Sequence, residues 1–422
     1  MSIKPAAARS ARMTPAGPVQ LQQALPLFFA FAFAYLFSAL LRGVMATLAP
    51  VFSVELGLTA ADLGLLAGAF FLGFAALQLP LGRALDRFGP RATLLWLLAV
   101  AVVGCTAFAA ARNLPELFAA RLLIGAGMAA CLMAPLTCFA ARLMPAAQLR
   151  ANSWLLMTGS LGMLSSTVPV QWLLPLWGWR GLFVALALGL LIAMALVAWR
   201  VPGGAAMVRP GDDAGQGGQT SYAAIVRHPL FVRLAPLGFF VYGGMIAVQS
   251  LWAGPWLTRL GGVTAAQSAQ GLFFINLAML FAFMVWGAVM PRLVQRDVGP
   301  LVLLTFGIPA SLLVLAWNVV AGGEAGAGHW AVWCVVCSFV TLSQPAVGQA
   351  FPVAQAGRAL SAFNLVIFSG VFSVQWGIGL AIDALRAVSV SETVAFQMAF
   401  SAFGVCCLAS YAWFLQRAPE RS

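Results

Sequence analysis

The chain has 422 residues, of which 62% are hydrophobic and only 8% are charged, and its mean hydropathy is +0.95. A soluble protein averages about 25% charged residues, so this composition excludes a water-soluble fold. The formal net charge of +12 is carried mainly by arginine.

Long continuous apolar runs predict membrane-spanning helices. A bilayer core about 30 Å thick needs about 20 apolar residues per helix, whereas a transmembrane barrel would alternate apolar and polar residues. We therefore expect an all-α integral membrane protein with twelve transmembrane helices in two six-helix bundles. The predicted spans cover residues 27–50, 60–81, 92–111, 117–141, 152–175, 181–199, 234–256, 266–290, 300–321, 330–351, 360–383 and 393–415.

The basic residues predict how these spans are oriented. If the N-terminus is inside, the inner segments carry 17 of the 23 lysines and arginines and the outer segments carry four. This asymmetry follows the positive-inside rule, and an anionic leaflet accounts for the net charge without a nucleic-acid partner. The predicted organisation is a cytoplasmic tail at 1–26, an N-terminal bundle at 27–200, a cytoplasmic linker at 201–232, a C-terminal bundle at 233–417 and a cytoplasmic tail at 418–422.

An internal repeat relates the two predicted bundles. Eight residues of the first half return unchanged 205 positions later, and each copy contains a predicted helix-capping threonine. A doubled membrane bundle with a site between its copies is the architecture of a transporter. The matching residues are Pro50, Gly57, Thr59, Ala60, Ala61, Gly82, Arg87 and Arg91 in the first half and Pro255, Gly262, Thr264, Ala265, Ala266, Gly287, Arg292 and Arg296 in the second.

The predicted inner loop after the second span reads GRALDRFGPR, from Gly82 to Arg91. It resembles the signature loop of the major facilitator superfamily, G-x-x-x-D-R-x-G-x-[RK]. The resemblance implies the fold of that superfamily and a cytoplasmic latch formed by Asp86 and Arg87 in one of two access states, with Gly82, Gly89 and Arg91 completing the motif. We also expect Gly82 to let two helices approach closely. A solvated loop that only orients the chain is the alternative.

A second resemblance lies in the fourth span, where Arg121, Gly125 and Gly127 follow the family pattern R-x-x-x-G-x-G. It implies that Arg121 and Gly125 take part in gating or proton transfer, and a local ion pair between Arg121 and Glu116 is the alternative.

In the second copy of the signature loop, Pro291 stands at the aspartate position. The fifth span lacks the adjacent Gly-Pro pair of the drug-efflux branch.

Arg42 is the candidate centre of a binding site. It lies inside the first span, where a charge in lipid must face protein or water, and the repeat places Ala247 at its equivalent position. A guanidinium suits a carboxylate or phosphate; pairing with backbone carbonyls or snorkelling outward are the alternatives. The other candidates for substrate binding are polar or aromatic residues. The alternative role of each is to form a hydrogen bond between helices. They are Tyr35 and Ser38 on the face of Arg42, and Tyr242, Gln249, Trp252, Asn276, Asn364 and Gln375 at helix-like spacings in the second half.

These residues predict a secondary transporter that moves a small organic anion, carboxylate or amino-acid-like, across a bacterial inner membrane by alternating access. Both termini are expected in the cytoplasm, and the expected partners are the anionic substrate, a coupling proton or counter-anion, and the lipid bilayer. We expect a monomer that is not an enzyme and uses no cofactor, metal or nucleic acid. The alternatives are an exporter of amphipathic drugs and a transporter-derived membrane sensor.

Overall fold

The structure is a computed structural model that describes residues 24–202, 222–296 and 298–416. Most of the predicted tail at 1–26, the tail at 418–422 and most of the linker at 201–232 lie outside these ranges. All regular elements within them are helices. Helices satisfy their backbone N–H and C=O groups internally, which is what a chain without access to water requires.

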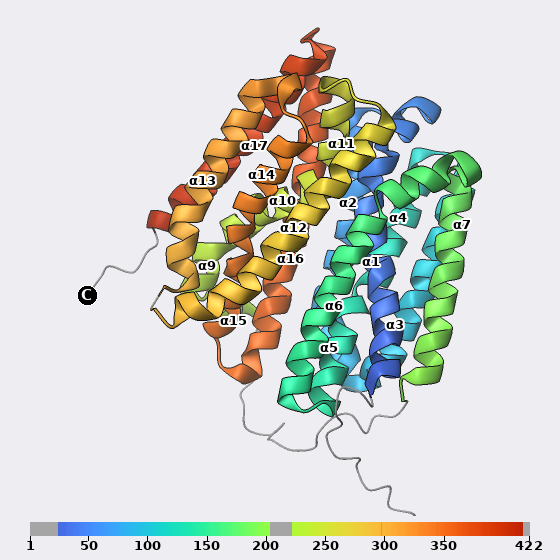
Figure 1. The fold of residues 1–422 in the computed structure, drawn as a ribbon, viewed down its shortest axis with the longest axis vertical. Coiled ribbons are helices and arrows are strands. Elements are labelled where there is room, and N and C mark those ends of the chain that lie inside the picture. Colours follow the sequence, from blue (N-terminus) through green and yellow to red (C-terminus); the bar gives the residue numbers. More distant parts are fainter. Residues whose placement is uncertain (1–23, 203–221, 297, 417–422) are drawn as a thin grey trace, which may run out of the picture.

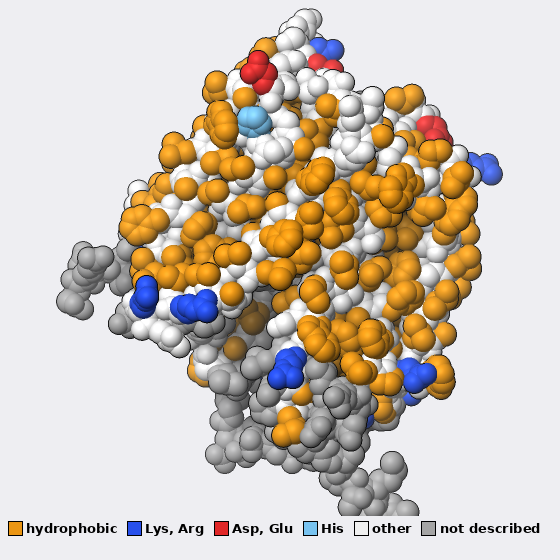
Figure 2. All heavy atoms as spheres, viewed as in Figure 1, with side chains coloured by type: hydrophobic (Ala, Val, Ile, Leu, Met, Phe, Trp, Pro, Cys, Tyr) orange, Lys and Arg blue, Asp and Glu red, His pale blue; other side chains and the backbone are white. Residues whose placement is uncertain are grey.

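Ten of the described helices are long and apolar enough to cross a membrane, and Ala60–Ala76 is a shorter apolar helix. Figure 2 shows one face of the molecule as largely hydrophobic through its middle, with charged side chains toward the ends. This arrangement suits a bilayer core between two polar interfaces. The ten helices are Leu25–Glu55, Gln78–Ala110, Leu114–Arg142, Val168–Arg200, Pro229–Leu260, Ala265–Met290, Pro300–Glu324, Ala327–Gln349, Gln355–Ala387 and Glu392–Gln416.

The described helices fall into two groups that lie side by side (Figure 1). The first group comprises α1 (Leu25–Glu55), α2 (Ala60–Ala76), α3 (Gln78–Ala110), α4 (Leu114–Met128), α5 (Ala130–Arg142), α6 (Pro145–Ser165) and α7 (Val168–Arg200). The second begins with α8 (Tyr222–Val226), α9 (Pro229–Pro236), η3 (Leu237–Tyr242), α10 (Gly243–Ala247), η4 (Val248–Trp252), α11 (Ala253–Pro255) and η5 (Trp256–Leu260). It continues with α12 (Ala265–Val294), α13 (Pro300–Ala321), η6 (Gly322–Glu324), α14 (Ala327–Cys337), η7 (Ser338–Leu342), α15 (Ser343–Gln349), α16 (Val353–Ala387) and α17 (Glu392–Gln416).

Two of these helices contain a glycine break. Gly89 in α3 has φ 77° and Gly178 in α7 has φ 61°, a left-handed conformation that glycine adopts without steric cost. Each glycine divides its helix into two arms, so α3 runs through the predicted loop at 82–91 and α7 runs through the predicted loop at 176–180. The helix boundaries therefore do not reproduce twelve separate helices.

The two groups meet by backbone contact at glycines. A side chain at Gly254 would meet the carbonyl of Ala46, and one at Gly64 would meet the carbonyl of Gln375. Small residues allow helices in lipid to pack this closely. These contacts lie toward the end of the bundle away from residues 25 and 416, which we call the distal end; the opposite end is the proximal end.

Within the first group, the glycines of the fourth-span motif are packing positions. A side chain at Gly125 would meet the carbonyl of Phe70 on α2, and one at Gly127 would meet Ala101 on α3. Gly82 differs, because a Cβ there would meet nothing within 4 Å. The expectation that Gly82 permits a close helix approach is therefore wrong for this structure, since the first arm of α3 is exposed at that residue.

The contrast between Gly125 and Gly82 gives a stability prediction. We expect Gly125→Val to lower the stability by about 1–3 kcal/mol, the usual cost of overpacking, because α4 must move away from α2. Gly82→Ala is the matched control and should be neutral or slightly stabilising, since alanine favours a helix. Thermal unfolding of the detergent-solubilised protein, followed by tryptophan fluorescence, measures both. Equal midpoints for the two variants would contradict the packing role.

Candidate functional site

One face of α1 points toward the second group of helices. Ala46 contacts Gly254 across the interface, and Arg42 lies one helical turn earlier on the same face. Tyr35 and Ser38 continue this face and are buried, whereas Arg42 is half-buried. The predicted stripe of Tyr35, Ser38 and Arg42 is thus directed inward rather than toward lipid.

Arg42 lies among polar groups of both halves of the chain. It is within electrostatic range of the Tyr242 hydroxyl on η3 and of the Cys131 thiol on α5. Tyr35 also lies near Tyr242. Within residues 24–202, 222–296 and 298–416, no hydrogen bond or ion pair engages the Arg42 guanidinium. The structure therefore brings a cation without a counter-ion to the interface between the halves.

A chain of hydrogen bonds links three helices behind Tyr242. Its hydroxyl donates to Oε1 of Gln344 on α15 over 3.4 Å, and Nε2 of Gln344 donates to Oδ1 of Asn364 on α16 over 2.6 Å. Asn364 is 8% exposed and Gln344 is half-buried. Gln344 is absent from the residues predicted from the sequence, although an amide inside the tenth predicted span was the available signal.

A second polar pair joins Gln249 on η4 to Asn276 on α12. Nε2 of Gln249 donates to Oδ1 of Asn276 over 2.9 Å, and Nδ2 of Asn276 donates to the Leu272 carbonyl over 2.9 Å. Asn276 is buried and Gln249 is half-buried. Gln249 therefore combines a fixed orientation with partial access, as a binding residue requires.

Two of the predicted site residues face the core of the second group. Trp252 is fully buried, and its indole N–H donates to the Gln375 carbonyl over 3.1 Å. Nε2 of Gln375 donates to the Ser250 hydroxyl over 3.0 Å. The sequence predicts Trp252 as a binding residue at a helix-like spacing from Tyr242 and Gln249, whereas its full burial places it in the core of the second group. The π-helical turns η3 and η4 change the α-helical register between these residues.

Arg121 is a fully buried charge on α4. Its Nη2 donates to the carbonyl of Leu41 on α1 over 2.7 Å, and its guanidinium lies 5.1 Å from the Phe70 ring centroid. Nε and Nη1 have no partner among the described residues. The alternative of a pair with Glu116 is wrong, because that carboxylate accepts from the Arg112 backbone N–H and the Asn113 amide.

The signature loop forms the corner between the two arms of α3. Arg91 donates to the carbonyl of Ala198 on α7 over 2.5 Å, and the Thr93 hydroxyl donates to the Ala84 carbonyl over 3.0 Å. Asp86 and Arg87 are exposed, and within the part of the chain that the structure describes neither bonds to the second half. Arg91 therefore ties the corner to its own half, and among the residues that the structure describes Asp86 has no hydrogen-bond partner.

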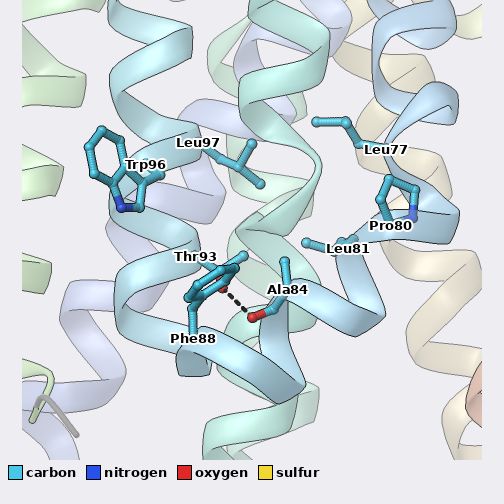
Figure 3. Close-up of a pocket in the computed structure, with 8 residues that line it drawn as sticks. All are labelled: Leu77, Pro80, Leu81, Ala84, Phe88, Thr93, Trp96 and Leu97. Carbon is cyan, nitrogen blue, oxygen red and sulfur yellow. Dashed lines mark hydrogen bonds between the residues drawn. The ribbon is translucent and has the colours of Figure 1, made fainter. Parts of the chain in front are cut away.

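An apolar cavity of about 250 Å³ lies between the two arms of α3 and the end of α2 (Figure 3). Thr93 is the one lining residue with a hydroxyl, and that hydroxyl is already bonded to the Ala84 carbonyl. An apolar wall does not suit an organic anion. The cavity is lined by Leu77, Pro80, Leu81, Ala84, Phe88, Thr93, Trp96 and Leu97.

Comparison with known proteins identifies relatives of this chain. The sequence profile of the Major Facilitator Superfamily matches residues 31–374. Among solved structures, a D-xylose-proton symporter is similar with a TM-score of 0.74 at 16% identity, covering 95% of this chain and 99% of that chain. A bacterial homologue of the human lysosomal transporter Spinster, in an inward-facing and unoccupied conformation, gives 0.73 at 15% identity over 95% and 98% of the two chains. A nucleoside transporter gives 0.72 at 12% identity over 94% and 100%.

The incomplete pairing of Arg121 generates a prediction that separates stability from transport. A buried charge with poor compensation is often replaced by an apolar side chain of similar volume without loss of stability. We expect Arg121→Met to keep or raise the thermal unfolding midpoint, whereas Arg121→Ala should lower it by leaving a cavity. Thermal unfolding in detergent measures both. A methionine variant as unstable as the alanine variant would show that the guanidinium stabilises the fold.

Proposed function

This chain belongs to the Major Facilitator Superfamily and is a secondary transporter, and from that premise we propose that its cargo is a small organic anion, carboxylate or amino-acid-like. It is not an enzyme. In this proposal twelve spans form two six-helix bundles, 27–200 and 233–417, that rock around a central site. Arg42 binds the anionic group of the substrate.

The unpartnered guanidinium of Arg42 is the observation that carries this proposal. A charge in the membrane interior is costly unless protein, water or a ligand compensates it. Arg42 is half-buried and faces the second half, and within the described residues no carboxylate or carbonyl engages it. A carboxylate would accept two parallel N–H bonds from the guanidinium, so an anion supplies the compensation that the protein does not.

The neutral polar groups of the second half support recognition of the rest of the substrate. Tyr242 and Gln249 are half-buried residues, and the hydroxyl of the first and the amide of the second are each hydrogen-bonded to an amide behind them. A few oriented polar groups among apolar neighbours are typical of small-molecule sites. We assign Tyr242 and Gln249, with Arg42, to direct contact. The buried Tyr35, Ser38, Asn276, Asn364, Gln375 and Trp252 support them from behind.

The charge inventory favours a singly charged substrate. The two arginines of the helix Pro229–Leu260 are already engaged, since Arg233 donates to the Phe414 carbonyl and Arg259 donates to Ser53 and Glu392. Neither is available as a second cation for a doubly charged phosphate ester. Arg42 therefore acts alone on the anionic group.

We further propose that the proximal end faces the cytoplasm of a bacterial inner membrane, with both termini there and the protein a monomer. The exposed Arg83 and Arg87 at this end support that orientation. In the access state closed at the proximal end, Asp86 and Arg87 would latch the halves, and Arg121 and Gly125 would keep α4 aligned with α1 and α2. A proton or a counter-anion would drive the cycle.

Replacing Arg42 tests the proposal directly. We expect Arg42→Ala to abolish binding of anionic ligands, and Arg42→Lys to weaken it at least about tenfold, because lysine keeps the charge but loses the bidentate geometry. A thermal-shift screen of purified protein against metabolite anions identifies a ligand, and uptake of that ligand into proteoliposomes measures transport. Arg112→Ala, an exposed arginine outside the site, is the matched control.

The same experiment separates the alternatives. Unchanged uptake of every anionic ligand by Arg42→Ala would overturn the anion proposal. Stabilisation by cationic amphipaths in place of anions would favour a drug exporter. Ligand binding without flux would favour a sensor.

A further inference from the structure

A carboxylate of the second half bonds the beginning of a helix in the first half. Asp383, near the distal end of α16, accepts hydrogen bonds from the backbone N–H of Ala60 over 3.2 Å and of Ala61 over 2.8 Å. These are the first two residues of α2, whose N–H groups have no acceptor within the helix. The partial positive charge of a helix N-terminus favours a carboxylate at this place.

The local cap of α2 leaves those two donors vacant. In the capping box, the Thr59 hydroxyl accepts from the Asp62 N–H and the Asp62 carboxylate accepts from the Thr59 N–H. The N–H groups of Ala60 and Ala61 are the ones that remain, and Asp383 satisfies both. The N-terminus of α2 is thus fully bonded only while the two halves touch.

The internal repeat shows that the fold does not demand this contact. The offset of 205 residues pairs Asp383 with Gly178, which has no side chain, and pairs Ala60 and Ala61 with Ala265 and Ala266. The start of α12 keeps its own capping box of Thr264 and Gln267. Within the described ranges, no side chain of the first half accepts from Ala265 or Ala266.

Close packing brings the aspartate within reach. A side chain at Gly379, one turn before Asp383, would meet the carbonyl of Ala60, so α2 and α16 are in backbone contact, and the two helices run beside each other in the structure (Figure 1). A second bridge lies nearby, where Nη2 of Arg259 donates to the Ser53 hydroxyl over 2.6 Å. Both bridges join the halves at the distal end.

We propose that Asp383 is the lock of the distal gate, a positioning residue that holds α2 against α16 and must release before the central site opens at that end. The inference rests on the proposed alternating-access function but not on the identity of the substrate. When the halves separate, the carboxylate and two backbone N–H groups become free to bond water. The bonds therefore stabilise only the state closed at the distal end.

The experiment compares two carboxylates at the same helix N-terminus. Asp383→Ala removes the acceptor from the opposite half, whereas Asp62→Ala removes one from the same half and is the matched control. Spin labels at Val54→Cys and Val388→Cys, in a Cys406→Ser background, report the separation of the halves in lipid nanodiscs. Val54 and Val388 are 87% and 70% exposed and lie at the distal ends of α1 and α16, and Cys406 is exposed whereas the other six cysteines are buried.

Asp383→Ala is expected to raise the ratio of long to short label distances roughly tenfold, the factor that about 1.4 kcal/mol represents. Hydrogen exchange of the peptide containing Ala60 and Ala61 should accelerate in parallel. Asp62→Ala should leave the label distances unchanged. Identical distances for Asp383→Ala and the parent, or an equal shift for Asp62→Ala, would overturn the lock.

Asp383→Asn keeps the size of the side chain and one carbonyl acceptor, so its label distances should lie between those of the parent and of Asp383→Ala. This variant tests the lock if the alanine variant does not fold. Arg42→Ala in the labelled background should leave the distances unchanged. If Arg42→Ala transports normally while Asp383→Ala opens the distal end, the anion proposal fails and the lock stands. If Asp383→Asn leaves the distribution unchanged while transport still requires Arg42, the lock fails and the anion proposal stands.

Discussion

The bilayer core supplies no hydrogen bonds, and this constraint decides how each polar group in the chain is placed. Arg121 on α4 and Arg42 on α1 satisfy this constraint in different ways, although both lie at the same turn of α1. Arg121 is sealed inside the first half and donates to the Leu41 carbonyl. Arg42, on the next residue of α1, stays half-buried and engages no partner within the described residues. A sealed charge that bonds a backbone carbonyl is not available to a ligand, whereas an accessible, unbonded charge is.

The same distinction orders the polar groups of the second half. Gln375 and Trp252 are fully buried and bond neighbouring helices. Tyr242 and Gln249 are half-buried, and each has an amide partner on its buried side. The accessible groups of Tyr242 and Gln249 are thus oriented by hydrogen bonds to amides behind them. These amides do not occupy the space that the two groups face. This order is what a site for a small solute needs.

The sequence could predict whatever depends on local pattern. Composition and long apolar runs predict a helical membrane protein, which the family match supports. The spacing of Tyr35, Ser38 and Arg42 predicts one inward face, because α1 is a regular α-helix around these residues. The helix-like spacing of Tyr242, Gln249 and Trp252 is less informative, because the π-helical turns η3 and η4 change the angle between successive residues. The hydrogen bonds from the N-terminus of α2 to Asp383 could not be predicted from the sequence, because they depend on which helices lie side by side.

Two aspartates divide the ends of the bundle between the halves. Asp86 belongs to the first half and lies at the proximal end, and the repeat places Pro291 at its equivalent position. Asp383 belongs to the second half and lies at the distal end, opposite Gly178 in the repeat. Asp86 and Asp383 thus come from different copies and lie at opposite ends of the bundle. Neither aspartate has a carboxylate at its repeat-equivalent position, so the two ends of the bundle are not equivalent.

The three π-helical turns at η3, η4 and η5 have a geometric consequence for the wall of the site. Each turn accommodates one residue more than the α-helical path requires. Within the helix Pro229–Leu260, the turns η3 and η4 therefore change the angle between the Tyr242 and Gln249 side chains from that of a regular α-helix. The local twist of one helix thus contributes to how this wall faces the site, in addition to the packing of whole helices against one another.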